Sequence, residues 1–178
     1  ERVAAAGNPS VCLATVLVGD DGPSQTYVRN KHKFAAAAGL QSRNETLPST
    51  ASQAEVEDLV GHLAADPNVH GILVQQPLPD HLDNDAVLRL LPATKDVDGL
   101  TAESLGRLVR GEAGLVPCTP LGVLRLLEHY KIPTTGKHAV IVGRSTLVGT
   151  PLAILLSRKG VDATATIARP ARCPLFMS

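Results

Sequence analysis

The sequence predicts an α/β protein of two lobes, in which parallel strands alternate with helices. Apolar, β-rich runs alternate with helical patterns along the chain, which is the order of a doubly wound sheet. Two of these runs, residues 69–74 and 138–143, are apolar almost throughout, as in parallel strands covered on both faces. A helix expected to start near Thr119 separates a first lobe, residues 1–119, from the beginning of a second lobe, residues 120–178.

The composition favours a globular protein that acts on small molecules. With 178 residues, of which 44% are hydrophobic and 19% charged, the chain can bury a substantial core. Its 17 basic and 17 acidic residues cancel, and no basic run is interleaved with aromatic residues, so neither nucleic acid nor a membrane is an expected partner. The cysteines are widely spaced and the histidines unclustered, which predicts reduced thiols and no metal site. No signal peptide or long apolar run is present, so we expect a cytoplasmic protein.

The first expected strand covers residues 14–19, and a helix follows over residues 24–38. Ser24 is the expected N-cap and Gly39 the C-cap. The spacing of three and four residues predicts a core-facing stripe of Val28, Lys31, Ala35 and Ala38, with Tyr27 and Phe34 beside it. Lys31 therefore stands where an apolar residue is expected. A partly buried amine loses its proton more easily than an exposed one and becomes a candidate acid or base, whereas a lysine at the edge of the stripe would only extend its amine to solvent.

The later elements alternate in the same way. Residues 41–47 form a weaker strand, and Ser52 with Glu55 forms a capping box that opens a helix. That helix should turn Val56, Leu59, Val60 and Leu63 inward. The remaining expected elements are a strand at 69–74, a short helix at 84–91, a helix capped by Thr101, a helix opened by Thr119 and Pro120, a buried strand at 138–143, a helix at 151–159 and a strand at 162–168.

Two loops carry candidate binding residues. Gln75 directly follows an expected parallel strand, and ligands collect at the carboxyl ends of such strands. Pro77 and Pro79 stiffen the same segment. Asp98, just before Gly99, could accept paired hydrogen bonds from adjacent N–H groups of a heterocycle. The alternative for both polar residues is that they only stabilise turns.

A strand, a glycine-containing turn and a helix over residues 138–159 predict a nucleotide-phosphate site. Gly143 and Gly149 allow the main chain to approach a pyrophosphate, which the N-terminal end of the following helix favours. The turn is not a G-x-G-x-x-G, so an ordinary tight turn is the alternative. Arg144, together with Arg169 in place of an acidic residue after the next strand, favours NADP over NAD.

Both ends of the sequence predict an incomplete chain. Residues 1–6 have the pattern of the last turns of a helix, which Gly7 would stop. Residues 169–178 contain two prolines and no periodicity. We therefore expect a fragment or a frameshifted product.

Six short motifs occur in a specific order and spacing. They are Val18-Gly19-Asp20, Tyr27 to Lys31, Gly71 to Pro79, Lys95 to Gly99, Pro117 to Pro120, and Gly143 to Ser145 with Val148 to Pro151. Together they resemble the bifunctional methylenetetrahydrofolate dehydrogenase and methenyltetrahydrofolate cyclohydrolase family over roughly residues 1–168. The resemblance implies a folate-binding first lobe and a Rossmann-type NADP-binding second lobe with parallel strands.

The resemblance also implies the chemistry. Tetrahydrofolate derivatives would be the substrates: 5,10-methylenetetrahydrofolate would give a hydride to NADP, and water would open the methenyl product to 10-formyltetrahydrofolate, a reaction of one-carbon metabolism and purine biosynthesis. The implied catalytic residues are Lys31, Gln75 and Tyr27. Lys31 would be the general acid and base of the hydrolytic step, Gln75 would hydrogen-bond to it, and Tyr27 would position the folate and stack on it. The implied folate contacts are Tyr27, Gln75, Pro77, Leu78 and Asp98, and the implied cofactor contacts are Gly143, Arg144, Ser145 and Gly149.

Two departures from the family pattern matter. Gln76 stands where the family usually has leucine, at the wall of the pocket. After Ile167 the chain continues with Ala168 and Arg169, where the family has a polar pair that contacts the cofactor. We therefore expect weak or no dehydrogenase activity from this chain, and the homodimer expected of the family would depend largely on the missing part of the second lobe.

Two other functions stay open on the sequence. A shikimate-dehydrogenase-like enzyme also combines a lysine- and aspartate-bearing lobe with a Rossmann lobe, but it predicts a turn richer in glycine than residues 144–147. A non-catalytic folate-binding module would use Lys31 for binding alone.

Overall fold

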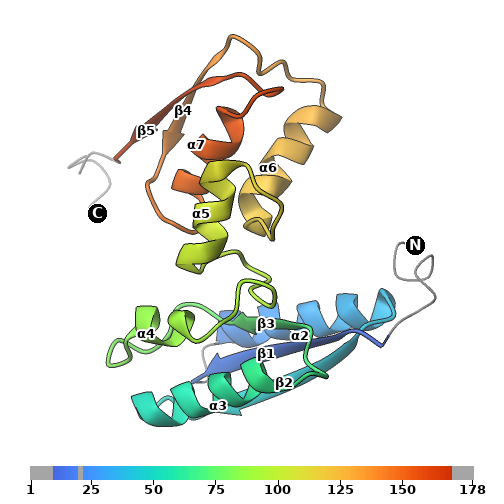
Figure 1. Cartoon of the computed structure of the whole chain (residues 1–178), viewed down its shortest axis with the longest axis vertical. Helices are drawn as coiled ribbons and strands as arrows, with labels where there is room; N and C mark the ends of the chain where they lie inside the picture. The colour runs from blue at the N-terminus through green and yellow to red at the C-terminus, as the bar shows by residue number, and fades with distance from the viewer. Residues whose placement is uncertain (1–9, 20–21, 170–178) are drawn as a thin grey trace. The chain divides into compact units, whose positions relative to one another are not determined.

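The computed structural model describes residues 10–19 and 22–169, apart from the side chains of residues 22–27 and 29. The chain divides into two compact units, Glu1–Val97 and Asp98–Ser178, which are shown in Figure 1. The lobe boundary expected after residue 119 stays a prediction. The helical end expected at residues 1–6 and the tail from residue 170 lie outside the described residues.

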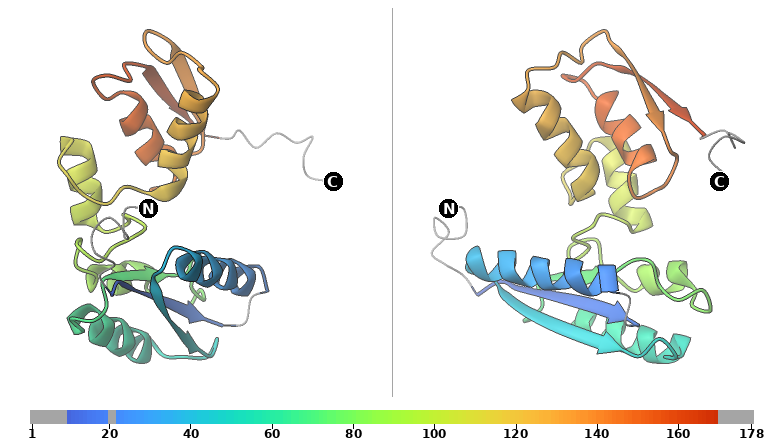
Figure 2. Two further views of the ribbon diagram at one scale, coloured as in Figure 1. Left: turned by 90° about the vertical axis from the view of Figure 1, so that its right-hand side faces the viewer. Right: turned by 180° about the vertical axis from the view of Figure 1, so that it is seen from behind.

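The first unit contains a parallel sheet of three strands in the order β2-β1-β3. The strands are β1 (Cys12–Val18), β2 (Gln41–Leu47) and β3 (Gly71–Val74). Helix α2 (Gly22–Ala37) covers one face, and helix α3 (Gln53–Ala65) covers the other (Figures 1 and 2). From the central strand β1 the chain passes first to β2 on one side and then to β3 on the other. The carboxyl ends of β1 and β3 therefore form a topological switch point, where open α/β sheets bind ligands.

The central strand is buried on both faces because helices cover both. Ala14 and Val16 are fully buried and belong to one core cluster with Val56 and Val60 of α3. That cluster extends to Val87 of α4 (Asn84–Arg89). Residues 15 and 17 point to the opposite face because side chains alternate along a strand, and both are buried.

Helix α2 differs in detail from the expectation. It begins at Gly22, so Ser24 lies inside its first turn and is not the N-cap; the fixed φ and missing N–H of Pro23 suit that first turn. The expected C-cap is confirmed: Gly39 has a φ of 77°, and the N–H of Leu40 donates to the carbonyl of Ala35 at 2.9 Å.

The predicted stripe of α2 is confirmed in its centre and wrong at its margins. Val28 and Ala35 are buried, and Lys31 is half-buried between them. Ala38 is exposed because it lies beyond the last turn, and Phe34 is 72% exposed because its position on the helix points away from the sheet.

Helix α3 begins as the sequence predicts. The Ser52 hydroxyl accepts a hydrogen bond from the N–H of Glu55 at 3.3 Å, and the Ser52 N–H donates to the Glu55 carboxylate at 2.8 Å. These two bonds form the capping box. The Ser52 N–H, and after it the Ser52 hydroxyl, which donates to the same carboxylate at 2.7 Å, hold the pKa of Glu55 below its ordinary value.

The second unit contains a two-stranded parallel sheet of β4 (His138–Val142) and β5 (Thr164–Ala168). Its helices are α5 (Ala102–Arg110), α6 (Cys118–His129) and α7 (Gly149–Leu156), of which α6 and α7 pack on the sheet. Thr101 caps α5 as expected, since its hydroxyl accepts from the N–H of Ser104 at 3.2 Å.

Strand β4 was expected to be buried, and this is wrong for one of its faces. Ala139 and Ile141 pack on Leu152 and Leu156 of α7. On the other face Val140 is 59% and Val142 71% exposed, because no described element covers that side of the sheet.

Several element boundaries also differ. Helix α6 begins one residue before Thr119, and α7 begins at Gly149 and ends at Leu156 instead of spanning residues 151–159. Helix α7 can begin at Gly149 because glycine has no side chain that would overlap the main chain of Gly143 in the preceding turn. Gly160, with a φ of 94°, lies in a separate turn beyond the helix end. Among the described residues, no helix is long and apolar enough to cross a membrane.

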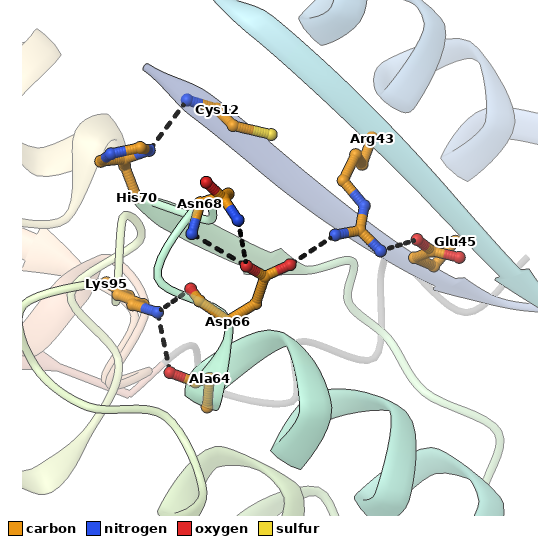
Figure 3. A network of polar contacts seen from close by, with 8 residues as sticks. All are labelled: Cys12, Arg43, Glu45, Ala64, Asp66, Asn68, His70 and Lys95. Atoms are coloured by element: carbon orange, nitrogen blue, oxygen red, sulfur yellow. Dashed lines mark hydrogen bonds and ion pairs between the residues drawn. The ribbon is translucent and has the colours of Figure 1, made fainter. Parts of the chain in front are cut away.

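A polar network lies at the amino ends of the strands in the first unit (Figure 3). Lys95 Nζ donates to the carbonyls of Ala64 and Asp66 at 2.8 and 2.7 Å and so stabilises the C-terminal end of α3. The Asp66 carboxylate accepts from the Asn68 N–H and from Arg43 at 2.8 Å each. These partners, the Asn68 N–H first, lower the pKa of Asp66. The network is at the opposite end of β3 from Gln75 and is structural.

Candidate active site

The structure brings together Lys31, the candidate acid or base, and Gln75, the candidate binding residue after β3. Nζ of Lys31, on α2, donates to Oε1 of Gln75 at 3.4 Å, and both side chains are half-buried. Gln75 follows the last residue of β3, and α2 follows β1, so the pair stands at the switch point of the sheet. The bond is longer than an ordinary N–H···O hydrogen bond, as is common for catalytic groups without a ligand.

The orientation of the Gln75 amide is fixed by its other contacts. Its main-chain N–H donates to the carbonyl of Val16 at 2.9 Å, which continues the pairing of β3 with β1. Its Nε2 donates to the carbonyl of Gln76 at 2.7 Å. Because a carbonyl can only accept, the nitrogen of the amide faces Gln76 and the oxygen is left to face Lys31. An acceptor is therefore held against the amine.

Two residues that the sequence did not single out fix α2 beside this pair. Thr15 of β1 is fully buried, and its Oγ1 lies 2.8 Å from Nε2 of His32 and 3.0 Å from Oδ1 of Asn44. The same hydroxyl lies 3.3 Å from the carbonyl of Arg43, so Thr15 joins α2 to β2 through three polar contacts. Thr15 has the pattern of any β-branched strand residue, and His32 that of a surface histidine, so no signal in the sequence marks this contact.

The other predicted folate contacts lie in different surroundings. Tyr27 is on α2 one turn before Lys31, but its side chain is outside the described part of the chain. Pro77 is exposed, whereas Leu78 belongs to the core cluster of the first unit. Asp98 is half-buried and begins the second unit. Their contacts with a substrate stay predictions.

The turn between β4 and α7 has the close main-chain packing of a phosphate-binding turn. Gly143 has a φ of 139°, a conformation that favours glycine. A Cβ on Gly149 would lie 2.7 Å from the carbonyl carbon of Gly143 and 3.1 Å from the main-chain nitrogen of Arg144. Arg144 and Ser145 are exposed, and the Ser145 hydroxyl accepts from the N–H of Val148 at 3.1 Å. A turn that is bounded by two closely packed glycines, next to a helix N-terminus and an exposed guanidinium, fits the phosphates of a nucleotide.

Comparison with known protein families shows to which family the chain belongs. The catalytic-domain model of tetrahydrofolate dehydrogenase/cyclohydrolase matches residues 1–98, and the model of that family's NAD(P)-binding domain matches residues 117–172. The chain belongs to the tetrahydrofolate dehydrogenase/cyclohydrolase family. The membership confirms the resemblance and favours it over the shikimate-dehydrogenase-like alternative.

Individual relatives agree with this membership. The chain is 50% identical over 155 residues to a bifunctional protein FolD of Streptomyces avermitilis, covering 87% of this chain and 53% of the relative. It is 50% identical over 165 residues to that of Desulfovibrio desulfuricans, covering 92% and 58%. The chain thus spans a little over half the length of these relatives.

Solved structures of the tetrahydrofolate dehydrogenase/cyclohydrolase family confirm the fold class. The bifunctional enzyme FolD of Campylobacter jejuni has a TM-score of 0.88 and 41% identity, over 96% of this chain and 60% of that one. The enzyme of Trypanosoma brucei, complexed with NADP cofactor and an inhibitor, has a TM-score of 0.88 and 35% identity, over 96% and 57%.

Proposed function

We propose that this chain carries the folate site of a methylenetetrahydrofolate dehydrogenase and methenyltetrahydrofolate cyclohydrolase, and that Lys31 is the acid and base of the hydrolysis. The observation that carries the proposal is the contact of the Lys31 amine with an oriented amide oxygen at the switch point of the sheet. Family membership supplies the substrate class, tetrahydrofolate derivatives.

The hydrolysis needs one group that moves a proton twice. Water adds through its oxygen to the one-carbon bridge of 5,10-methenyltetrahydrofolate while the Lys31 amine takes one of its protons. The ammonium then returns that proton to the ring nitrogen as the bond between this nitrogen and the bridge carbon breaks. The remaining hydroxyl proton leaves to solvent, which gives neutral 10-formyltetrahydrofolate and accounts for the lost positive charge. The Gln75 oxygen holds the amine in place during both transfers.

The second unit contributes the beginning of the NADP site in this proposal. NADP, when bound, would supply the hydride acceptor for the oxidation of 5,10-methylenetetrahydrofolate. Gly143 and Gly149 would admit its phosphates to the turn, and Arg144 with Ser145 would face the 2′-phosphate. Tyr27 and Asp98 are proposed to bind the folate, and Pro77 and Leu78 to shape that site. A homodimer and a cytoplasmic location are part of the proposal and have the support of family membership alone.

The decay of 5,10-methenyltetrahydrofolate absorbance tests the hydrolysis. The chain, its Lys31→Met variant and its Lys33→Met variant are compared with buffer; Lys33 is on the same helix but exposed, so it controls for the loss of a positive charge. We expect acceleration by the chain and by Lys33→Met, and a loss of about 10²–10⁴-fold in Lys31→Met, the usual contribution of a general acid or base.

The outcomes separate the enzyme from a binding module. Folate binding in calorimetry without acceleration would show the non-catalytic module. Acceleration that survives in Lys31→Met would overturn the role given to this lysine.

A further inference from the structure

Gln76 makes a side-chain contact that an apolar residue at this position could not make. Its side chain is half-buried, and its Nε2 donates to Oδ1 of Asn84 at 2.6 Å. Asn84 is the first residue of α4, and Gln76 directly follows the candidate active-site residue Gln75. The loop after β3 is thereby attached to a helix.

Helix α4 is a firm point of attachment. Its N-cap Asp83 is joined to α3 by two hydrogen bonds with Gln53: the Asp83 N–H donates to Oε1 at 2.8 Å, and Gln53 Nε2 donates to the Asp83 carbonyl at 3.3 Å. Val87, in the middle of α4, is fully buried in the core of the first unit. The Asn84 side chain therefore holds Gln76 relative to the sheet.

The main-chain carbonyl of Gln76 is the group that orients the active-site amide, since it accepts from Gln75 Nε2 at 2.7 Å. Residue 76 is thus held at two places, by Asn84 at its side chain and by Gln75 at its carbonyl. If the side chain is released, the ψ torsion of Gln76, which sets the direction of its carbonyl, loses this restraint, while the φ of Pro77 stays fixed by its ring. The Gln75 amide then loses the acceptor that distinguishes its nitrogen from its oxygen, and its oxygen is no longer held toward Lys31.

We propose that Gln76 and Asn84 are positioning residues, which hold the Gln76 carbonyl so that the Gln75 amide presents its oxygen to Lys31. The catalytic part of this inference rests on the proposed function. Its structural part, the fixed orientation of the Gln75 amide, does not.

Four variants test the inference. Gln76→Leu and Asn84→Ala remove the contact, and Asn84→Asp keeps an acceptor oxygen for Gln76 Nε2. Gln53→Ala is the matched control, because it removes two hydrogen bonds between α3 and the N-cap of α4 while buried Val87 still holds α4 in the core and the Gln75–Gln76–Asn84 chain is unchanged. The two readouts are the NMR signals of the Gln75 side-chain amide, assigned by their absence in Gln75→Met, and kcat and KM for hydrolysis of 5,10-methenyltetrahydrofolate.

We expect Gln76→Leu and Asn84→Ala to move the Gln75 amide proton signals toward the values of a free side chain. Both should lower kcat by about two- to tenfold, the effect of one hydrogen bond, with little change in KM. Asn84→Asp should leave the Gln75 amide signals and kcat close to those of the unchanged chain, in contrast to Asn84→Ala. Gln53→Ala should lower the unfolding temperature and leave both readouts as in the unchanged chain.

Unchanged Gln75 signals in Gln76→Leu would overturn the inference, and so would a fall in kcat that is equal in Gln53→Ala. If the unchanged chain does not hydrolyse 5,10-methenyltetrahydrofolate, the proposed function fails, and the amide signals still decide whether Gln76 and Asn84 orient Gln75.

Discussion

The packing of Gly149 against Gly143 allows a sharp test of the nucleotide-binding turn. In Gly149→Ala the added Cβ would lie 2.7 Å from the Gly143 carbonyl carbon and 3.1 Å from the Arg144 nitrogen. The Gly143 carbonyl oxygen is closer still, and all three neighbours are main-chain atoms, so no side-chain rotation relieves the overlap and the turn itself must move. Overpacking of this kind costs about 1–3 kcal/mol, which exceeds the gain of at most ~1 kcal/mol from replacing glycine by alanine in a helix. We expect the second unit to lose about 1–2 kcal/mol of stability.

Gly122→Ala is the matched control for this change. Gly122 lies within α6 of the same unit, and nothing is found within 4 Å of an added Cβ. This variant should gain about 0.5–1 kcal/mol, since only the backbone entropy of the unfolded state changes.

The assay is urea unfolding followed by circular dichroism, fitted with separate transitions for the two units. NADP binding by calorimetry is measured alongside, and Gly149→Ala should weaken it while Gly122→Ala should not. The reasoning is refuted if Gly149→Ala is as stable as Gly122→Ala, because the turn would then accept a side chain that the geometry excludes.

Three further predictions concern stability and solubility. Hydrogen bonds from Ser52 hold the pKa of Glu55 below its ordinary value, so the stabilisation by its carboxylate is complete at neutral pH and is lost as the pH falls through the folded-state pKa. Glu55→Gln should therefore lower the unfolding temperature at neutral pH, and this difference should shrink as the pH is lowered through the acid range. Lys95→Met should cost about 1–3 kcal/mol in urea unfolding, because two carbonyls at the end of α3 lose their donor, and Lys95→Arg should recover part of the loss. Val142 is 71% exposed on the open face of β4, so Val142→Lys should change stability by no more than about 0.5 kcal/mol. It should also reduce any self-association seen in light scattering, because it places a charge on an exposed apolar face. An unchanged scattering signal would show that this face does not promote self-association.

Local signals in the sequence account for much of the fold. The capping box of Ser52 and Glu55, the cap at Thr101 and the glycine C-cap at Gly39 each depend on residues a few positions apart, and all three are confirmed. The burial of β4 was wrong because a run of apolar residues does not state how many helices cover a strand. Val140 and Ala139 look alike in the sequence, yet only the second faces α7.

The candidate site was predictable only in part, for a similar reason. Parallel strands and the rule of the carboxyl ends are enough to place Gln75 near a ligand, and helical spacing is enough to turn Lys31 inward. The contacts that orient these two residues join segments far apart in the sequence, such as Thr15 with His32 and Gln76 with Asn84. Single polar residues of this kind leave no periodic pattern.

The two ends of the central sheet have different tasks, and this explains where polar residues occur in the first unit. At the amino ends, Asp66 and Lys95 each have two or more hydrogen-bond partners within the unit, as expected of groups that stabilise the fold. At the carboxyl ends, the hydrogen bond from Lys31 to Gln75 is long, and the orientation of the Gln75 amide is fixed by its neighbours. An amine on a rigid scaffold with a weak partner can change that partner for a reacting atom at little cost. A substitution that shortens and strengthens the Lys31 contact, such as Gln75→Glu, should therefore lower kcat for hydrolysis, because the new carboxylate would hold the amine as an ammonium. It should add little to the stability of the free protein, because the carboxylate would also face the Gln76 carbonyl without a proton to share.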